Sequence, residues 1–164
     1  LNIDDNSKNK AKLLKTRFRF NRVGYSSRLT ELEAALGVDE VDRSNEIIVS
    51  RRGNALKLGH LLKEFEDRLI LPPFSFENAW MFYPIVCKEK ISRDKFCLFL
   101  EEKGIQTRYI MPLTNQPVYK GMWREKDYPV ADWINKKGFL IGIHHFLKKK
   151  DLIYVRDCFR EYLR

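Results

Sequence analysis

Two polar segments contain the residue types that could bind an anion. In the first, residues 25–28, two serine hydroxyls and the guanidinium of Arg28 come just before a helix start. Thr30 and Glu33 have the spacing of a capping box, which predicts that the helix begins at Thr30 and holds the turn before it in place. Because a guanidinium donates paired hydrogen bonds to a phosphate or carboxylate, Arg28 is a candidate anion ligand, although it could also be a surface group.

The second segment combines Arg108 with the irregular loop 112–119. Prolines at or near this loop predict that Thr114, Asn115 and Gln116 are held in an extended conformation and present hydrogen-bonding groups at little entropic cost. Thr114 does not ionise near neutral pH, so it could bind a substrate but not transfer a proton. The two amides could equally satisfy backbone groups of the loop.

Histidines and aromatic residues gather near predicted strands. His144 and His145 follow one strand, and since successive side chains of a strand point to opposite faces, we expect that they do not form one site. Trp80, Phe82 and Tyr83 could stack on bases, but alternating aromatic residues on a strand favour a core. His60 has no clustered partners, so no metal site is predicted.

One stretch, residues 24–37, reads GYSSRLTELEAALG and closely resembles the signature of the DegT/DnrJ/EryC1/StrS family of pyridoxal-phosphate-dependent sugar aminotransferases. The resemblance covers roughly residues 17–164 and continues, in the family's order, through residues 77–84, 104–108, 112–119, 128–131 and 138–144.

The resemblance also implies roles for individual residues. Ser26 stands where the family has an Asn that reaches the cofactor phosphate of the other subunit, and Arg28 lies near that phosphate, so both are implied to bind the cofactor. The implied substrate-binding residues are Arg108, Thr114, Asn115, Gln116 and His144. Many members have His at the position of Thr114. No catalytic residue is expected here, because the family places its aldimine-forming lysine in a large domain before this stretch.

The order of predicted elements indicates an α+β fold. A long helical region over 30–65 precedes a small, mainly antiparallel sheet covered by helices, and a bend is expected near Gly37 or Gly53. Strands are predicted over 79–87, 105–111 and 139–143, and Pro84 suggests an edge position or a bulge for the first. Helices are predicted after Ser92, over 129–137, and at the C-terminus, where three lysines obscure the start.

The resemblance identifies this fold with the small C-terminal domain of fold-type I pyridoxal-phosphate enzymes. Residues 1–29 are expected to be a linker and active-site turn from an absent N-terminal large domain, with a linker or frayed helix in the lysine-rich residues 1–16. Residues 30–164 are expected to be the small domain with its connecting helix.

Composition narrows the class of protein. The chain has 164 residues, 44% of them hydrophobic, enough for one core, and no apolar run long enough to span a membrane. Three widely spaced cysteines indicate reduced, buried thiols of a cytoplasmic protein. A net charge of +9 would suit an anionic partner such as a nucleotide-linked substrate, a phospholipid or nucleic acid.

The resemblance implies transfer of an amino group from an amino acid such as glutamate to a nucleotide-linked keto-deoxysugar, with pyridoxal phosphate as cofactor. The implied partners are the chain's own large domain, a second copy in a homodimer, the nucleotide sugar and the amino donor, with no nucleic acid or membrane. The chain alone is expected to be inactive. Alternatives are a sugar dehydrase, a catalytically silent family member or, outside the family, a basic polyanion-binding domain.

Overall fold

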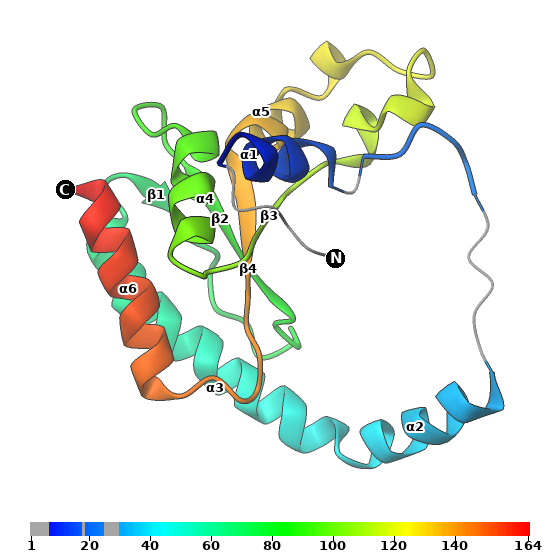
Figure 1. Ribbon diagram of the computed structural model, residues 1–164, viewed down its shortest axis with the longest axis vertical. Coiled ribbons are helices and arrows are strands. Elements are labelled where there is room, and N and C mark those ends of the chain that lie inside the picture. Colours follow the sequence, from blue (N-terminus) through cyan, green and yellow to red (C-terminus); the bar gives the residue numbers. More distant parts are fainter. Residues whose placement is uncertain (1–6, 18, 25–29) are drawn as a thin grey trace.

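The structure, a computed structural model, describes residues 7–17, 19–24 and 30–164. Within them, one antiparallel sheet has the order β1-β2-β4-β3, with helices around it (Figure 1). The strands are β1 (Leu69–Ile70), β2 (Phe82–Cys87), β3 (Thr107–Tyr109) and β4 (Gly138–Gly142). The α-helices are α1 (Ser7–Thr16), α2 (Glu31–Asp42), α3 (Ser44–Leu62), α4 (Arg93–Glu102), α5 (Pro129–Lys137) and α6 (Lys149–Leu163). The predicted α+β class is confirmed.

The strand β2 alternates between buried and half-buried side chains, so the sheet has one core face. Tyr83, Ile85 and Cys87 lie on that face, whereas Pro84 lies on the opposite one. The predicted edge position of Pro84 is wrong for the strand, because β2 lies between β1 and β4. However, β1 pairs only with Val86 and Cys87, so Pro84 has a neighbouring strand on one side alone.

The core centres on Phe96 of α4, which is fully buried. Its ring meets Phe139 of β4 at 5.6 Å between centroids, Phe159 of α6 at 4.8 Å, and Tyr162 of α6 at 4.6 Å. The Ser92 hydroxyl caps α4 by accepting from the Lys95 amide, as the sequence predicts. The three cysteines are buried and unpaired, which confirms their prediction as reduced thiols.

The lysine-rich N-terminal segment contains a helix rather than only a linker. Leu14 of α1 is 2% exposed and joins the core, where α1 packs against α4 and β3. The guanidinium of Arg17 donates to the Thr107 carbonyl at 3.0 Å and thereby covers the open edge of β3. A single buried leucine produces no periodic pattern, so the sequence could not reveal this packing.

The helix predicted from Thr30 begins where its capping box places it. The Glu33 amide donates to Thr30 Oγ1 at 3.3 Å, and the Thr30 amide donates to the Glu33 carboxylate at 2.9 Å. The predicted bend at a glycine is wrong: both helices continue through their glycines, and the break lies at Arg43. A glycine within a helix costs only about 1 kcal/mol relative to alanine, too little to end it.

Several predicted boundaries shift by a few residues. The first long strand starts at Phe82 rather than 79, since Trp80 has a left-handed φ of 52°. The predicted strand 105–111 is reduced to β3, and the predicted strand 139–143 starts one residue early as β4. The start of α6 among lysines is explained by Asp151, whose carboxylate accepts from the Lys148 amide at 2.8 Å.

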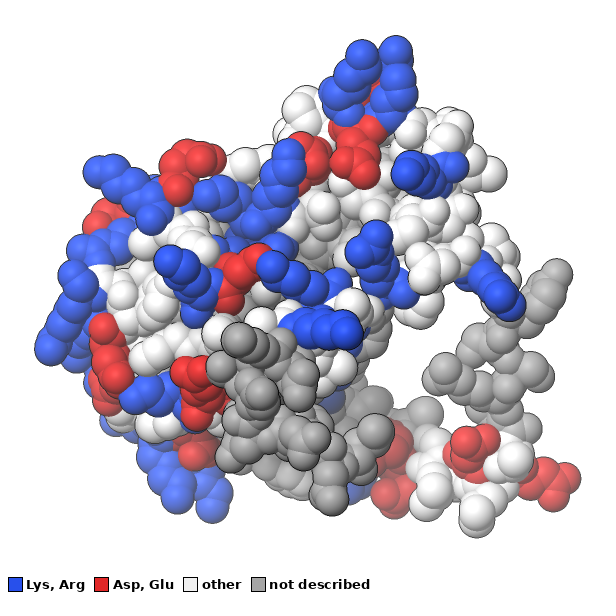
Figure 2. All heavy atoms as spheres, turned by 45° about the horizontal axis from the view of Figure 1, so that its top comes forward, with Lys and Arg blue, Asp and Glu red and all other residues white. Residues whose placement is uncertain are grey.

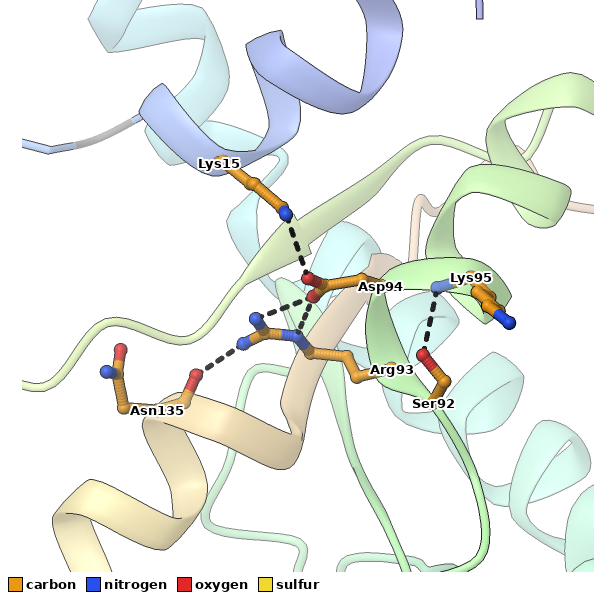
Figure 3. Close-up of polar contacts among 6 residues, drawn as sticks. All are labelled: Lys15, Ser92, Arg93, Asp94, Lys95 and Asn135. Carbon is orange, nitrogen blue, oxygen red and sulfur yellow. Dashed lines mark hydrogen bonds and ion pairs between the residues drawn. The ribbon is translucent and has the colours of Figure 1, made fainter. Parts of the chain in front are cut away.

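A polar network ties α1 and α5 to the N-terminus of α4 (Figure 3). Arg93 pairs with Asp94 at 2.8 Å and donates to the Asn135 carbonyl of α5, while Lys15 of α1 lies 3.4 Å from Asp94. The Arg93 guanidinium also lies 3.7 Å from the centroid of the Tyr109 ring. Burial raises the pKa of Asp94, but hydrogen bonds from Arg93 and Tyr109 and the charges of Arg93 and Lys15 outweigh it and lower the pKa.

We expect Asp94→Asn to lower the free energy of unfolding by on the order of 1 kcal/mol at about pH 7, and by much less at about pH 3. Because folding lowers this pKa, the stabilisation is present above the unfolded value near 3.9 and is lost as the pH falls through the folded value. Urea unfolding at both pH values measures the difference. Asp67→Asn, at an exposed carboxylate beside Arg68, is the control, and an equal loss in both variants would contradict the role of the network.

Candidate functional site

Two of the candidate site residues, Ser26 and Arg28, lie outside the described residues. The structure therefore supports only the element that follows them, the capped start of α2 at Thr30. Their predicted role as cofactor-binding residues stays a prediction.

A cleft of about 410 Å³ brings Arg108 and His144 together. It lies beside the end of β4 and the first turns of α6, with Phe82 and Leu140 among its apolar walls and Gln106, Asp151 and Tyr154 among its polar lining residues. The Arg108 guanidinium lies 5.0 Å from the centroid of the Phe82 ring. This volume suits a small molecule, and an arginine and a histidine suit an anionic one.

Arg108 is aimed at the cleft by its neighbour Thr107. Thr107 is fully buried, and its hydroxyl donates to the Glu101 carboxylate at 2.9 Å. Since adjacent residues of a strand face opposite sides, burial of Thr107 turns Arg108 to the other face. Arg17, which binds the Thr107 carbonyl, supports the same geometry. Sequence reasoning missed Arg17, because it lies in a run of basic residues that is typical of a solvated surface.

His144 lies in the turn between β4 and α6. Its Nδ1 accepts a hydrogen bond from the Phe146 amide at 3.3 Å, so the neutral ring carries its proton on Nε2. The prediction that His144 and His145 point apart is wrong: their ring centroids are 4.2 Å apart. The strand ends at Gly142, so the alternation of strand side chains does not extend to them.

Thr114, Asn115 and Gln116 do not line the cleft. The predicted extended conformation is wrong for the first two, which lie in a 3-10 turn, η2 (Leu113–Asn115). The Thr114 hydroxyl donates to Asn115 Oδ1 at 3.1 Å, and Gln116 Oε1 accepts from the Phe20 amide at 3.1 Å. These contacts support the interpretation that the loop residues satisfy polar groups of the loop and its surroundings.

The surroundings of the described lysines differ from those that a pyridoxal phosphate site requires. A Schiff-base lysine is activated by an apolar or cationic environment. No lysine whose burial is described is buried, and Lys103 and Lys136 pair with Glu161 and Asp132 at 2.7 and 2.6 Å, which raises their pKa values. The expectation of pyridoxal phosphate as the cofactor therefore depends on the family resemblance.

Other ligand classes receive little support from the described part of the chain. It contains no group of three His, Cys, Asp or Glu residues placed to hold a metal, and its helices lack the length or apolar character to cross a membrane. Lys and Arg are interspersed with Asp and Glu over most of the face in Figure 2, while acidic residues mark the region of α2 at its lower right. A single basic surface for a nucleic acid is not seen on this face.

Comparison with known proteins agrees with the motifs. The model of the DegT/DnrJ/EryC1/StrS aminotransferase family matches residues 5–160. The chain belongs to this family. The predicted fold, the small domain of a fold-type I enzyme, is also supported by solved structures. The DesV structure of S. venezuelae, in complex with a ketimine intermediate, has a TM-score of 0.72 and 21% identity, with 92% of this chain and 42% of that chain covered.

Curated relatives include a lipopolysaccharide biosynthesis protein and a sugar dehydratase. The lipopolysaccharide biosynthesis protein RfbH of Salmonella typhimurium is 27% identical, with 89% of this chain and 35% of that protein covered. The GDP-4-keto-6-deoxy-D-mannose 3-dehydratase of Escherichia coli O55:H7 is 26% identical, with coverages of 87% and 38%. The chain thus spans well under half the length of these relatives.

We expect this chain, mixed with pyridoxal phosphate, to form no stable internal aldimine, because no lysine whose burial is described lies in the buried apolar environment that activates a Schiff-base lysine. Absorbance spectra before and after dialysis measure this. Weak adducts on exposed amines should disappear on dialysis, whereas a stoichiometric band that survives it would contradict the prediction.

Proposed function

We propose that this chain is the small-domain part of a longer, cytoplasmic pyridoxal-phosphate-dependent enzyme that transfers an amino group from an amino acid such as glutamate to a nucleotide-linked keto-deoxysugar. The observation that carries the proposal is the convergence of Arg108 and His144, which lie in two separate family motifs, on one cleft. Family membership over residues 5–160 and the limited share of each relative that is covered support it.

Within this proposal, Arg108 binds an anionic group of the nucleotide sugar. Its guanidinium is held between the Phe82 ring and the cleft, so part of the entropic cost of ordering the side chain is met before binding. The exposed Nε2 edge of His144 can donate a hydrogen bond to the same substrate. Thr114, Asn115 and Gln116 lie in the η2 region and would contact the substrate only from outside the cleft.

We further propose that residues 1–29 lead from a large domain into the small domain of residues 30–164. Ser26 and Arg28 would bind the cofactor phosphate of the partner copy in a homodimer. The capping box supports this role, because it fixes the start of α2 at Thr30, shortly after these two residues. The large domain would supply the lysine that forms the aldimine with the cofactor.

A sugar dehydrase is the second candidate, and the similarity to a GDP-4-keto-6-deoxy-D-mannose 3-dehydratase favours its consideration. In this family a dehydrase carries His in place of the aldimine lysine. The residue at that position in the longer protein decides between the two activities, and any residue other than Lys or His there would indicate a catalytically silent member.

The apolar side chains of α2 are expected to make the isolated chain associate. Leu32, Leu36, Val38 and Val41 are 64–74% exposed, and exposed apolar patches mark interfaces. We expect sedimentation velocity to show self-association that rises with concentration, and the double variant Leu36→Gln/Val41→Gln to reduce it. Val130→Gln, at an exposed apolar position of α5, is the control. A parent chain that stays monomeric at high concentration would contradict the prediction.

Variants of the longer enzyme test the cofactor turn. Arg28→Ala should remove charge-assisted hydrogen bonds and reduce binding or transition-state stabilisation by about 2–4 kcal/mol, whereas Ser26→Ala should cost about 1 kcal/mol. Arg28→Lys should recover only part of the loss, because an ammonium lacks the bidentate fork. Ser26→Asn should keep or tighten cofactor binding. Cofactor titration and kcat/KM measure these effects.

Arg22→Ala, at an exposed arginine before the turn, serves as the matched control. If Arg28→Ala left cofactor affinity and kcat/KM within about twofold of the parent, like the control, while lowering thermal stability, the turn would be structural and its assignment to the cofactor site would fail.

A further inference from the structure

The turn between β4 and α6 is tied to α3 and carries His145. Asn54 of α3 holds this turn, because its Nδ2 donates to the His144 carbonyl at 2.9 Å and to the Leu147 carbonyl at 3.3 Å. Arg51 lies one helical turn before Asn54, so both side chains project from the same side of α3. His145 sits in the held turn, with its ring centroid 4.1 Å from that of Phe146.

Two buried nitrogen atoms in this region have no hydrogen-bond partner among the described residues. They are Nε of Arg51 and Nδ1 of His145. A buried polar atom without a partner costs free energy, so native proteins rarely retain one without a reason. Here, two such atoms come from elements that the Asn54 contacts hold together.

The surroundings favour a negative charge. Loss of hydration is the largest cause that lowers the pKa of His145, followed by electrostatic interactions with His144, Arg51 and Arg43. Glu40 is the one acidic side chain among these causes and opposes them. A guanidinium Nε–H and an imidazole N–H are both good donors to an oxyanion, and an anion would relieve the repulsion between the cationic groups.

We propose that Arg51 and His145 form a binding site for an oxyanion, a phosphate or carboxylate group, between α3 and the turn after β4. Arg51 Nε and His145 Nδ1 donate to its oxygen atoms, and Arg43 adds positive charge nearby. The site uses neither Arg108 nor the turn at Ser26 and Arg28. The proposal of this oxyanion site is therefore independent of the enzymatic activity proposed above.

Titration of the chain with inorganic phosphate, at ionic strength held constant with chloride, tests the site. Calorimetry should show saturable binding. In an NMR pH titration, phosphate should raise the pKa of His145, because the anion stabilises the imidazolium, while the exposed His60 on α3 should not respond. Arg51→Gln should weaken phosphate binding at least about tenfold and, without phosphate, should itself raise the pKa of His145 by removing a positive charge.

Matched variants separate this site from general attraction to a basic chain. Lys57→Gln removes the same charge from an exposed position of α3 and should leave phosphate affinity within about twofold. His145→Phe keeps a ring against Phe146 but removes the donor, and should weaken binding severalfold. Unsaturable binding, or equal losses for Arg51→Gln and Lys57→Gln, would overturn the proposal and show only nonspecific attraction.

Discussion

The fold depends on the burial of the Phe96 ring where α4, β4 and α6 meet. Its contacts with Phe139, Phe159 and Tyr162 join three elements that are far apart in the sequence. Aromatic contacts of this kind combine a large buried area with specific geometry. Because α6 forms one side of the cleft and the end of β4 carries the turn with His144, this packing also sets the distance between the sides of the candidate site.

The face of the sheet opposite the core carries Arg108, a residue of the candidate site. Burial of Thr107 on the core face is secured by Glu101 and Arg17, and it leaves Arg108 on the face that is only half covered. The charge of Arg108 therefore stays near solvent, which avoids the cost of burying a charge. The Phe82 ring also supplies an apolar surface for the guanidinium.

The α2 helix is stabilised by local hydrogen bonds rather than by burial in the core. It is amphiphilic without being packed, since it carries five acidic residues (Glu31, Glu33, Asp39, Glu40 and Asp42) and none of its residues is buried. Its start is secured locally by the Thr30 and Glu33 contacts rather than by a core. The helix is thus stabilised locally by its cap and keeps an exposed apolar surface.

Local signals in the sequence were sufficient for the caps of α2 and α4, the stop of α5 before Gly138, the buried cysteines and the α+β class. The family motifs also pointed to Arg108 and His144. These features depend on residues a few positions apart, or on motifs that can be read directly.

The tertiary structure alone decided that α1 buries Leu14, that the helix breaks at Arg43, and that His144 stacks on His145. It also tied Asn54 of α3 to the turn after β4 and separated the η2 loop from the cleft. Such features arise from long-range packing, in which neighbours distant in sequence decide where a strand ends and which way a side chain points.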